Sequence, residues 1–95
     1  MSADQLLREA ARTYEQRAAV YQDNNIRTGA MLAAAFPDGI TLENAKDHER
    51  YVIFALLIVK LSRYAVNWES GHQDSIHDAA VYAAILEAID AGRGV

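Results

Sequence analysis

Two cations and two carboxylates lie on either side of one predicted loop. Lys60 and Arg63 end an apolar run, and Asp74 and Asp78 follow the loop. Residues three or four apart share a helix face. The cations suit phosphate or another anion, because arginine makes bidentate phosphate contacts. The same side chains also fit a simpler interpretation, a partly buried ion pair between Arg63 and Asp78.

Further polar residues extend both groups. Asn67 continues the stripe of cations, Tyr82 continues the stripe of carboxylates, and His72 lies in the loop itself. Because the loop 67–73 is short, we expect the helices that it joins to be antiparallel neighbours. The two stripes then face each other and form one polar site near the loop.

A metal ion is the alternative ligand of this site. Asp74 and Asp78 are one helical turn apart, and two such carboxylates can hold Mg²⁺ together with substrate phosphates. Lys60 and Arg63 would compete with that metal for the carboxylates. The chain contains no cysteine, so the sequence excludes thiolate metal sites and disulfides.

A second cluster surrounds the end of the first predicted helix. It consists of Arg17, Tyr21, Asp23 and Asn24, with Tyr14 one turn earlier. One interpretation is aromatic core packing, with Arg17 extending to the surface. The other is a stacking platform for a nucleobase, with Arg17 near its phosphate.

Length and charge limit the function classes. The 95 residues predict a single domain, 1–95, and the net charge of −4 argues against bulk binding of nucleic acid. The longest apolar run, 52–59, is far shorter than the roughly 20 residues that span a bilayer. The charged, periodic N-terminus does not resemble a signal peptide. We therefore expect a cytoplasmic protein that uses no membrane.

Helical periodicity and turn residues divide the first part of the chain. Ser2 and Gln5 predict a capping box at the start of a helix over 3–21. The polar segment 22–25 predicts a break, and a shorter, alanine-rich helix is expected over 26–36.

Phe36-Pro37-Asp38-Gly39 is the clearest turn signal, and Thr41 is expected to cap the next helix. That helix covers about 42–67, unless a turn near Asp47-His48 divides it. The apolar run within it is typical of a core helix.

Asp74 or Ser75 is expected to cap the last helix, and Gly92 to end it. The sequence thus predicts an all-α fold: a small helical bundle with a long apolar central helix and an antiparallel C-terminal helix. An unbroken central helix would be about 39 Å long, which exceeds what a compact domain of this size needs. We therefore expect a homo-oligomer, with a dimer favoured.

Three motifs resemble a family of small, all-helical phage and prophage proteins labelled MazG-like. They are Arg17 with Tyr21-Gln22-Asp23-Asn24, the K-x-x-R of Lys60 and Arg63, and the H-x-D-x-x-x-D-x-x-x-Y from His72 to Tyr82. The resemblance covers about residues 14–88. It implies a distant relation to all-α nucleoside triphosphate pyrophosphohydrolases, which use Mg²⁺ held by acidic motifs on two neighbouring helices.

The chain departs from those enzymes at the central helix. Lys60 and Arg63 stand where the enzymes carry an E-x-x-E pair, so only Asp74 and Asp78 remain as acids. Metal-dependent phosphoryl chemistry needs several convergent carboxylates. The favoured hypothesis is therefore a phage-type protein that binds a nucleotide or related phosphorylated ligand without turnover.

Two other functions stay open. One is a working Mg²⁺-dependent nucleoside triphosphate pyrophosphohydrolase, with Asp74 and Asp78 as metal ligands. The other is a phage accessory protein that acts in the host cytoplasm by binding and modulating a host protein.

Overall fold

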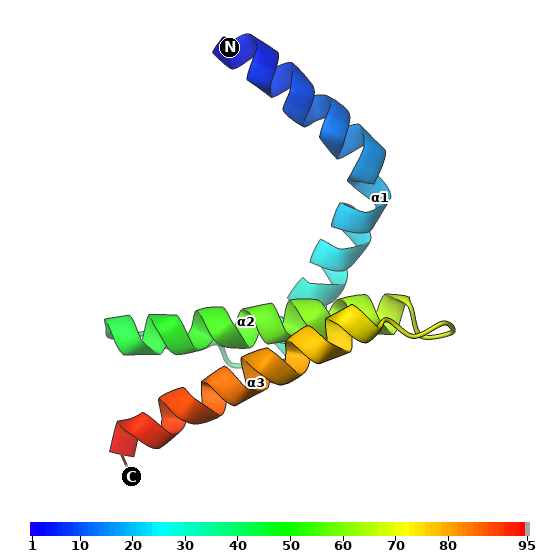
Figure 1. Ribbon diagram of the computed structural model, residues 1–95. Coiled ribbons are helices and arrows are strands. Elements are labelled where there is room, and N and C mark those ends of the chain that lie inside the picture. The colour runs from blue at the N-terminus through cyan, green and yellow to red at the C-terminus, as the bar shows by residue number, and fades with distance from the viewer. Residues whose placement is uncertain (95) are drawn as a thin grey trace.

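Three α-helices make up the chain. The computed structural model describes residues 1–94, and it describes side chains for residues 1–18 and 24–92. The helices are α1 (Ala3–Ala35), α2 (Ala45–Val66) and α3 (Gln73–Gly94), as shown in Figure 1. The described part of the chain contains no strand, which confirms the all-α prediction. None of its helices is both long and apolar enough to cross a membrane.

The first helix is longer than predicted. Its start is the expected capping box: the Ser2 backbone N–H donates to Gln5 Oε1 at 3.0 Å, and the Gln5 N–H donates to Ser2 Oγ. The predicted break at 22–25 is wrong, because α1 continues as one helix from Ala3 to Ala35. Asp and Asn inside a helix cost only about 0.7 kcal/mol each, and no Gly or Pro accompanies them there. The helix curves along its length (Figure 1).

The turn after α1 is confirmed, and the cap of α2 is corrected. The Gly39 N–H donates to the Phe36 carbonyl at 3.0 Å, and Gly39 has φ +83°. Asn44, not Thr41, is the N-cap of α2, because its side chain accepts from the Asp47 N–H at 2.9 Å. The helix then runs unbroken to Val66, so no turn divides it near residue 47.

A short loop returns the chain antiparallel to α2 and leads into α3 (Figure 1). Asn67 caps α2, and Gly71 turns the chain with φ +75°. The last helix begins at Gln73, slightly before the predicted caps Asp74 and Ser75, and it continues to Gly94. Gly92 is therefore inside the helix and does not end it.

The buried core is confined to the contact between α2 and α3. Among the residues whose side chains are described, four are buried: Ile58, Ser62, Ser75 and Ala79. They form an i,i+4 pair on each helix, and three of the four are small. The apolar run 52–59 therefore does not behave as the predicted core helix, since Ile58 is its only buried residue and the others are partly or largely exposed. Three helices supply too few neighbours to cover every face of α2.

The chain is unusually open for its size. Its radius of gyration is 16.6 Å, whereas a compact chain of this length has about 12 Å. Its accessible surface is 7077 Å², whereas a folded monomer of this mass exposes about 5,400 Å². The excess of about 1,600 Å² measures the surface that the chain does not cover by itself.

The N-terminal half of α1 accounts for much of this openness. It projects away from the α2–α3 hairpin (Figure 1), and every residue from 1 to 17 is exposed. Among the described helices α1 packs on α2 and not on α3. We call residues 3–18 the α1 arm.

Two glycines give a matched test of this backbone. Gly39 has φ +83°, whereas Gly29 lies inside α1, and an added Cβ would meet no atom within 4 Å at either position. Gly39→Ala should destabilise the fold by about 1 kcal/mol through backbone strain alone. Gly29→Ala should stabilise it by about 1 kcal/mol through helix propensity. Urea unfolding followed by circular dichroism measures both, and two changes of the same sign would contradict the assignment.

Candidate functional site

One ion pair joins α2 to α3 at the predicted site. Lys60 Nζ lies 3.0 Å from Asp78 Oδ2. The Lys60 side chain is only 19% exposed, and that of Asp78 is about half exposed. The prediction that Arg63 makes this pair is therefore wrong. Lys60 reaches Asp78 from the side of α2 that faces α3, whereas Arg63, three residues later, is exposed.

The other predicted residues of the hairpin differ in their exposure and in their hydrogen-bond partners. The Asn67 side chain does not face α3, because its Nδ2 donates to the Arg63 carbonyl at 2.8 Å and closes the end of α2. Asp74 is exposed, whereas Tyr82 is half-buried on α3 one turn beyond Asp78. The His72 ring hydrogen-bonds through Nδ1 to Ser75 Oγ, so it helps to order the start of α3.

Buried hydroxyl and amide oxygens without partners lie on the helices beside this pair. Ser62 is 0% exposed, and its Oγ has no hydrogen-bond partner among the described residues. The same holds for Asn24 Oδ1 and Thr28 Oγ1 on α1. Asn24 and Thr28 are four residues apart on the partly buried face of α1, and α2 is the helix on which α1 packs. Buried polar atoms without a partner often mark a site for water or a ligand.

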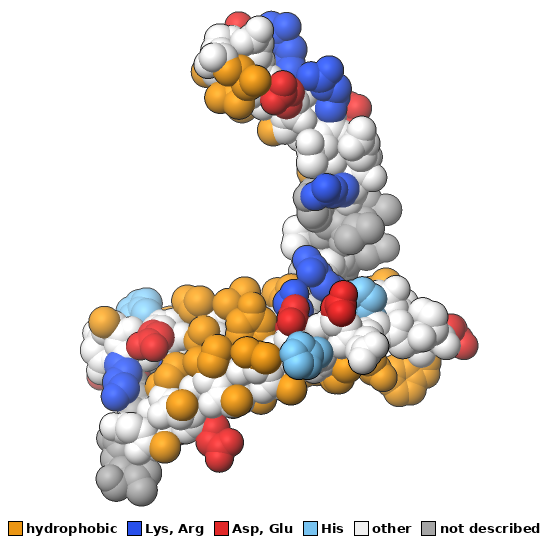
Figure 2. Space-filling view, in the orientation of Figure 1, with side chains coloured by type: hydrophobic (Ala, Val, Ile, Leu, Met, Phe, Trp, Pro, Cys, Tyr) orange, Lys and Arg blue, Asp and Glu red, His pale blue; other side chains and the backbone are white. Residues whose placement is uncertain are grey.

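Charged side chains gather at this place. Figure 2 shows basic, acidic and histidine side chains together where the foot of α1 reaches the α2–α3 hairpin. The Lys60–Asp78 pair joins α2 to α3, and Arg63 is exposed on the next turn of α2. Of the predicted residues, the structure therefore brings together Lys60, Asp78 and, on the next turn of α2, Arg63.

Two residues of the second predicted cluster lie at the surface. Tyr14 is 48% exposed on the α1 arm, and Arg17 is exposed. The predicted core packing therefore does not hold for Tyr14, which lies at the surface, while Arg17 extends into solvent as expected. The side chains of Tyr21 and Asp23 lie outside the described residues, so the stacking platform stays a prediction.

Asp74 and Asp78 have no third metal ligand beside them in the described part of the chain. Within the described part of the chain, no three His, Asp or Glu side chains are grouped so that they could hold a metal ion. Asp74 and Asp78 are one turn apart on α3, but one oxygen of Asp78 already contacts Lys60. A magnesium ion there would need most of its ligands from substrate and water. The predicted metal site remains a prediction.

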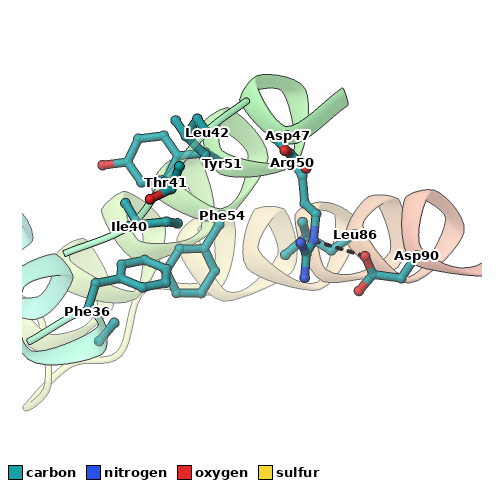
Figure 3. Close-up of a pocket in the computed structure, with 11 residues that line it drawn as sticks. Phe36, Ile40, Thr41, Leu42, Asp47, Arg50, Tyr51, Phe54, Leu86 and Asp90 are labelled. Carbon is teal, nitrogen blue, oxygen red and sulfur yellow. Dashed lines mark ion pairs between the residues drawn. The ribbon is translucent and has the colours of Figure 1, made fainter. Parts of the chain in front are cut away.

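Sequence reasoning missed a groove at the other end of α2. Its volume is 410 Å³, within the roughly 300–1,000 Å³ of ligand pockets. Phe36 forms its floor with Phe54, at 5.4 Å between ring centroids, and Arg50 Nε pairs with Asp90 Oδ1 at 3.1 Å across its edge (Figure 3). The full lining is Ala35, Phe36, Ile40, Thr41, Leu42, Asp47, Arg50, Tyr51, Phe54, Leu86 and Asp90.

This groove has only a weak signal in the sequence. Its residues come from the end of α1, the loop before α2, the first turns of α2 and the second half of α3. The one local indication is the aromatic spacing of Tyr51 and Phe54, which share a face of α2. Thr41, predicted as a helix cap, lines the groove instead.

Comparison with protein-family models, curated proteins and solved structures finds no match to this chain. The resemblance to MazG-like proteins therefore stays a prediction that depends on the three motifs.

A double-mutant cycle tests which cation pairs with Asp78. We expect Lys60→Ala and Asp78→Ala to show a coupling of about 0.5–1 kcal/mol in unfolding free energy, because the pair is partly exposed. The matched cycle of Arg63→Ala with Asp78→Ala should give a coupling near zero. Urea unfolding of the variants measures both, and a larger coupling for Arg63 would reverse the assignment.

The two buried serines should respond in opposite directions. Ser62→Ala removes a buried hydroxyl that has no partner, so it should stabilise the fold by about 1 kcal/mol. Ser75→Ala removes the hydroxyl that binds the His72 ring, so it should destabilise the fold by about 1 kcal/mol. Thermal unfolding of the two variants decides this. Equal losses would mean that Ser62 has a partner in solution.

Proposed function

We propose that this protein binds a nucleotide or related phosphorylated ligand and does not turn it over. The phosphate would lie beside Arg63 and Lys60, near the place where α1 reaches the α2–α3 hairpin. The observation that carries the proposal is the pairing of Lys60 with Asp78 beside an exposed Arg63. Asp78 holds one cation in place, and the guanidinium of Arg63 is left accessible to an anion.

The buried oxygens supply a second argument for a polar ligand. Ser62 lies between Lys60 and Arg63 in sequence, and its hydroxyl has no partner among the described residues. Because Ser62 is 0% exposed, a water bound between the ligand and the helices would satisfy that hydroxyl, which otherwise costs free energy in the folded state. Asn24 and Thr28 offer further oxygens on the face of α1 that is turned to α2.

Binding without turnover follows from the charges. Cleavage of a phosphoanhydride with Mg²⁺ needs several carboxylates around the metal. Here one of the two candidate carboxylates is neutralised by Lys60, and no third acid lies with them in the described region. The arrangement suits an anion better than a cation.

We also propose that the working form is a homodimer. The support is the excess of about 1,600 Å² over the surface of a compact monomer. A standard interface takes about 800 Å² from each partner, so the uncovered surface is large enough for one. The MazG-like relation enters here as a proposal too, supported by the K-x-x-R motif and by the motif from His72 to Tyr82.

A second candidate function is binding of a host protein by an accessory protein. The observation that favours it is the number of exposed large apolar side chains, such as Leu7, Ile26, Trp68 and Val81. Exposed apolar surface of this extent marks protein interaction sites. The two candidates differ in which molecule covers that surface.

A ligand panel tests the phosphate proposal. Nucleoside mono-, di- and triphosphates, cyclic nucleotides, pyrophosphate and inorganic phosphate are added separately, and the melting temperature is measured by circular dichroism. A ligand at one hundred times its Kd adds about 2.7 kcal/mol, which should raise Tm by about 10 °C or more. Chromatography of the same mixtures with Mg²⁺ should show no monophosphate product.

Three variants sharpen this measurement. Arg63→Ala should remove most of the shift, and Ser62→Ala should reduce it although the free protein becomes more stable. Arg12→Ala is the matched control, since Arg12 is an exposed arginine on the α1 arm, and it should leave the shift unchanged. No shift with any compound, or equal loss in Arg12→Ala and Arg63→Ala, would overturn the proposed site.

A further inference from the structure

The α1 arm carries an apolar stripe that is largely exposed to solvent. Leu7, Ala11, Tyr14 and Ala18 are separated by four, three and four residues, the spacing of a coiled-coil seam. Leu7 is 70% exposed, and Figure 1 shows that the arm stands away from the other helices. A helix with an apolar stripe is stabilised chiefly by packing that stripe on another surface. Within the described part of one chain, the arm therefore has no helix surface on which its apolar stripe packs.

A matching stripe lies on α2. Val52, Leu56, Val59 and Val66 follow the same alternating spacing, with Arg63 at the position between the last two. Val52 is 53% exposed, and Leu56 and Val66 are exposed as well. Figure 2 shows apolar side chains along the face of the α2–α3 hairpin that is turned to the viewer. We call these four residues the α2 stripe.

The arm is long enough to cover the α2 stripe. The arm has 16 residues and is about 24 Å long, and the α2 stripe extends over about 21 Å. Arg63 interrupts the α2 stripe with a positive charge. The edges of the arm stripe carry Arg8, Glu15 and Arg17, and Glu15, next to Tyr14, is the acidic side chain there that can meet such a charge on a partner helix. Within one chain, however, the arm points away from α2 and leaves both stripes exposed.

We propose that the α1 arm of one copy packs on the α2 stripe of a second copy, and that the exchange is reciprocal. The same two surfaces then meet twice around a two-fold axis, as expected of a closed dimer. The exchange would cover both stripes at once, and it uses the excess surface that distinguishes this chain from a compact monomer. This inference rests on the proposed homodimer and names its interface.

Single-cysteine cross-linking tests the exchange directly, because the natural chain has no cysteine. Chains with Ala11→Cys and chains with Val59→Cys are unfolded together, refolded and mildly oxidised. Both residues lie near the middle of their stripes, so they meet whether the helices pack parallel or antiparallel. Each chain has one thiol, so every disulfide joins two chains. We expect the mixed disulfide to exceed either homodisulfide by about tenfold, against the roughly twofold excess that random pairing gives.

Gln16→Cys replaces Ala11→Cys in the matched control. Gln16 lies on the opposite face of the arm from the stripe, so its yield of mixed disulfide should fall to the random level. Homodisulfides of Ala11→Cys in place of mixed ones would show that arms pair with arms, and would overturn the exchange while leaving a dimer. Random yields in both mixtures would also overturn it.

A second pair of variants, measured by light scattering, tests the same interface and includes a control for misfolding. Leu7→Asp puts a carboxylate into the arm stripe and should weaken the dimer at least about tenfold, since a buried leucine contributes about 1.5–3 kcal/mol. Gln16→Asp puts the same group on the opposite face and should leave the dimer unchanged. A natural chain that is monomeric at micromolar concentration would overturn both the dimer and the exchange, and would favour a different protein as the partner. The ligand panel is read separately, so failure of the phosphate proposal remains distinguishable.

Discussion

The close packing of α2 on α3 is the contact on which the rest of the structure depends. Ile58 and Ser62 lie on α2, and Ser75 and Ala79 lie on α3. All four are buried where the two helices pack together. Small side chains let two helices approach closely, but they bury little apolar area. The hairpin thus gains a fixed geometry from a small core. Larger apolar residues remain outside it and need another surface.

The same contact determines the polar site. Since α2 and α3 are antiparallel and closely packed, Lys60 and Asp78 are held opposite each other without a long-range fold around them. Arg63 is one turn further along, beyond the reach of that carboxylate, and it remains exposed. One cation is neutralised, and the other is left to attract an anion. A site of this kind needs only two helices and one loop.

Local rules predicted the parts of this fold that depend on neighbouring residues. The Ser2–Gln5 capping box, the Pro37 turn and the antiparallel hairpin all follow from short stretches of sequence. The continuity of α1 could not be predicted in this way, because the cost of four polar residues in a helix depends on the stability of the flanking segments. The choice of Lys60 over Arg63 also depended on the relative rotation of two helices, which spacing alone leaves open.

The exposure of residues 1–17 has a consequence for the amount of folded protein. An isolated helix of this length is only marginally stable in water, and a second chain that covers it adds stability in proportion to the logarithm of chain concentration. The arm would then fray in dilute solution and become ordered as the protein accumulates. If the arm pairs two chains as proposed, proteolytic trimming at low abundance would remove the pairing segment, and expression level would then act as a threshold for assembly.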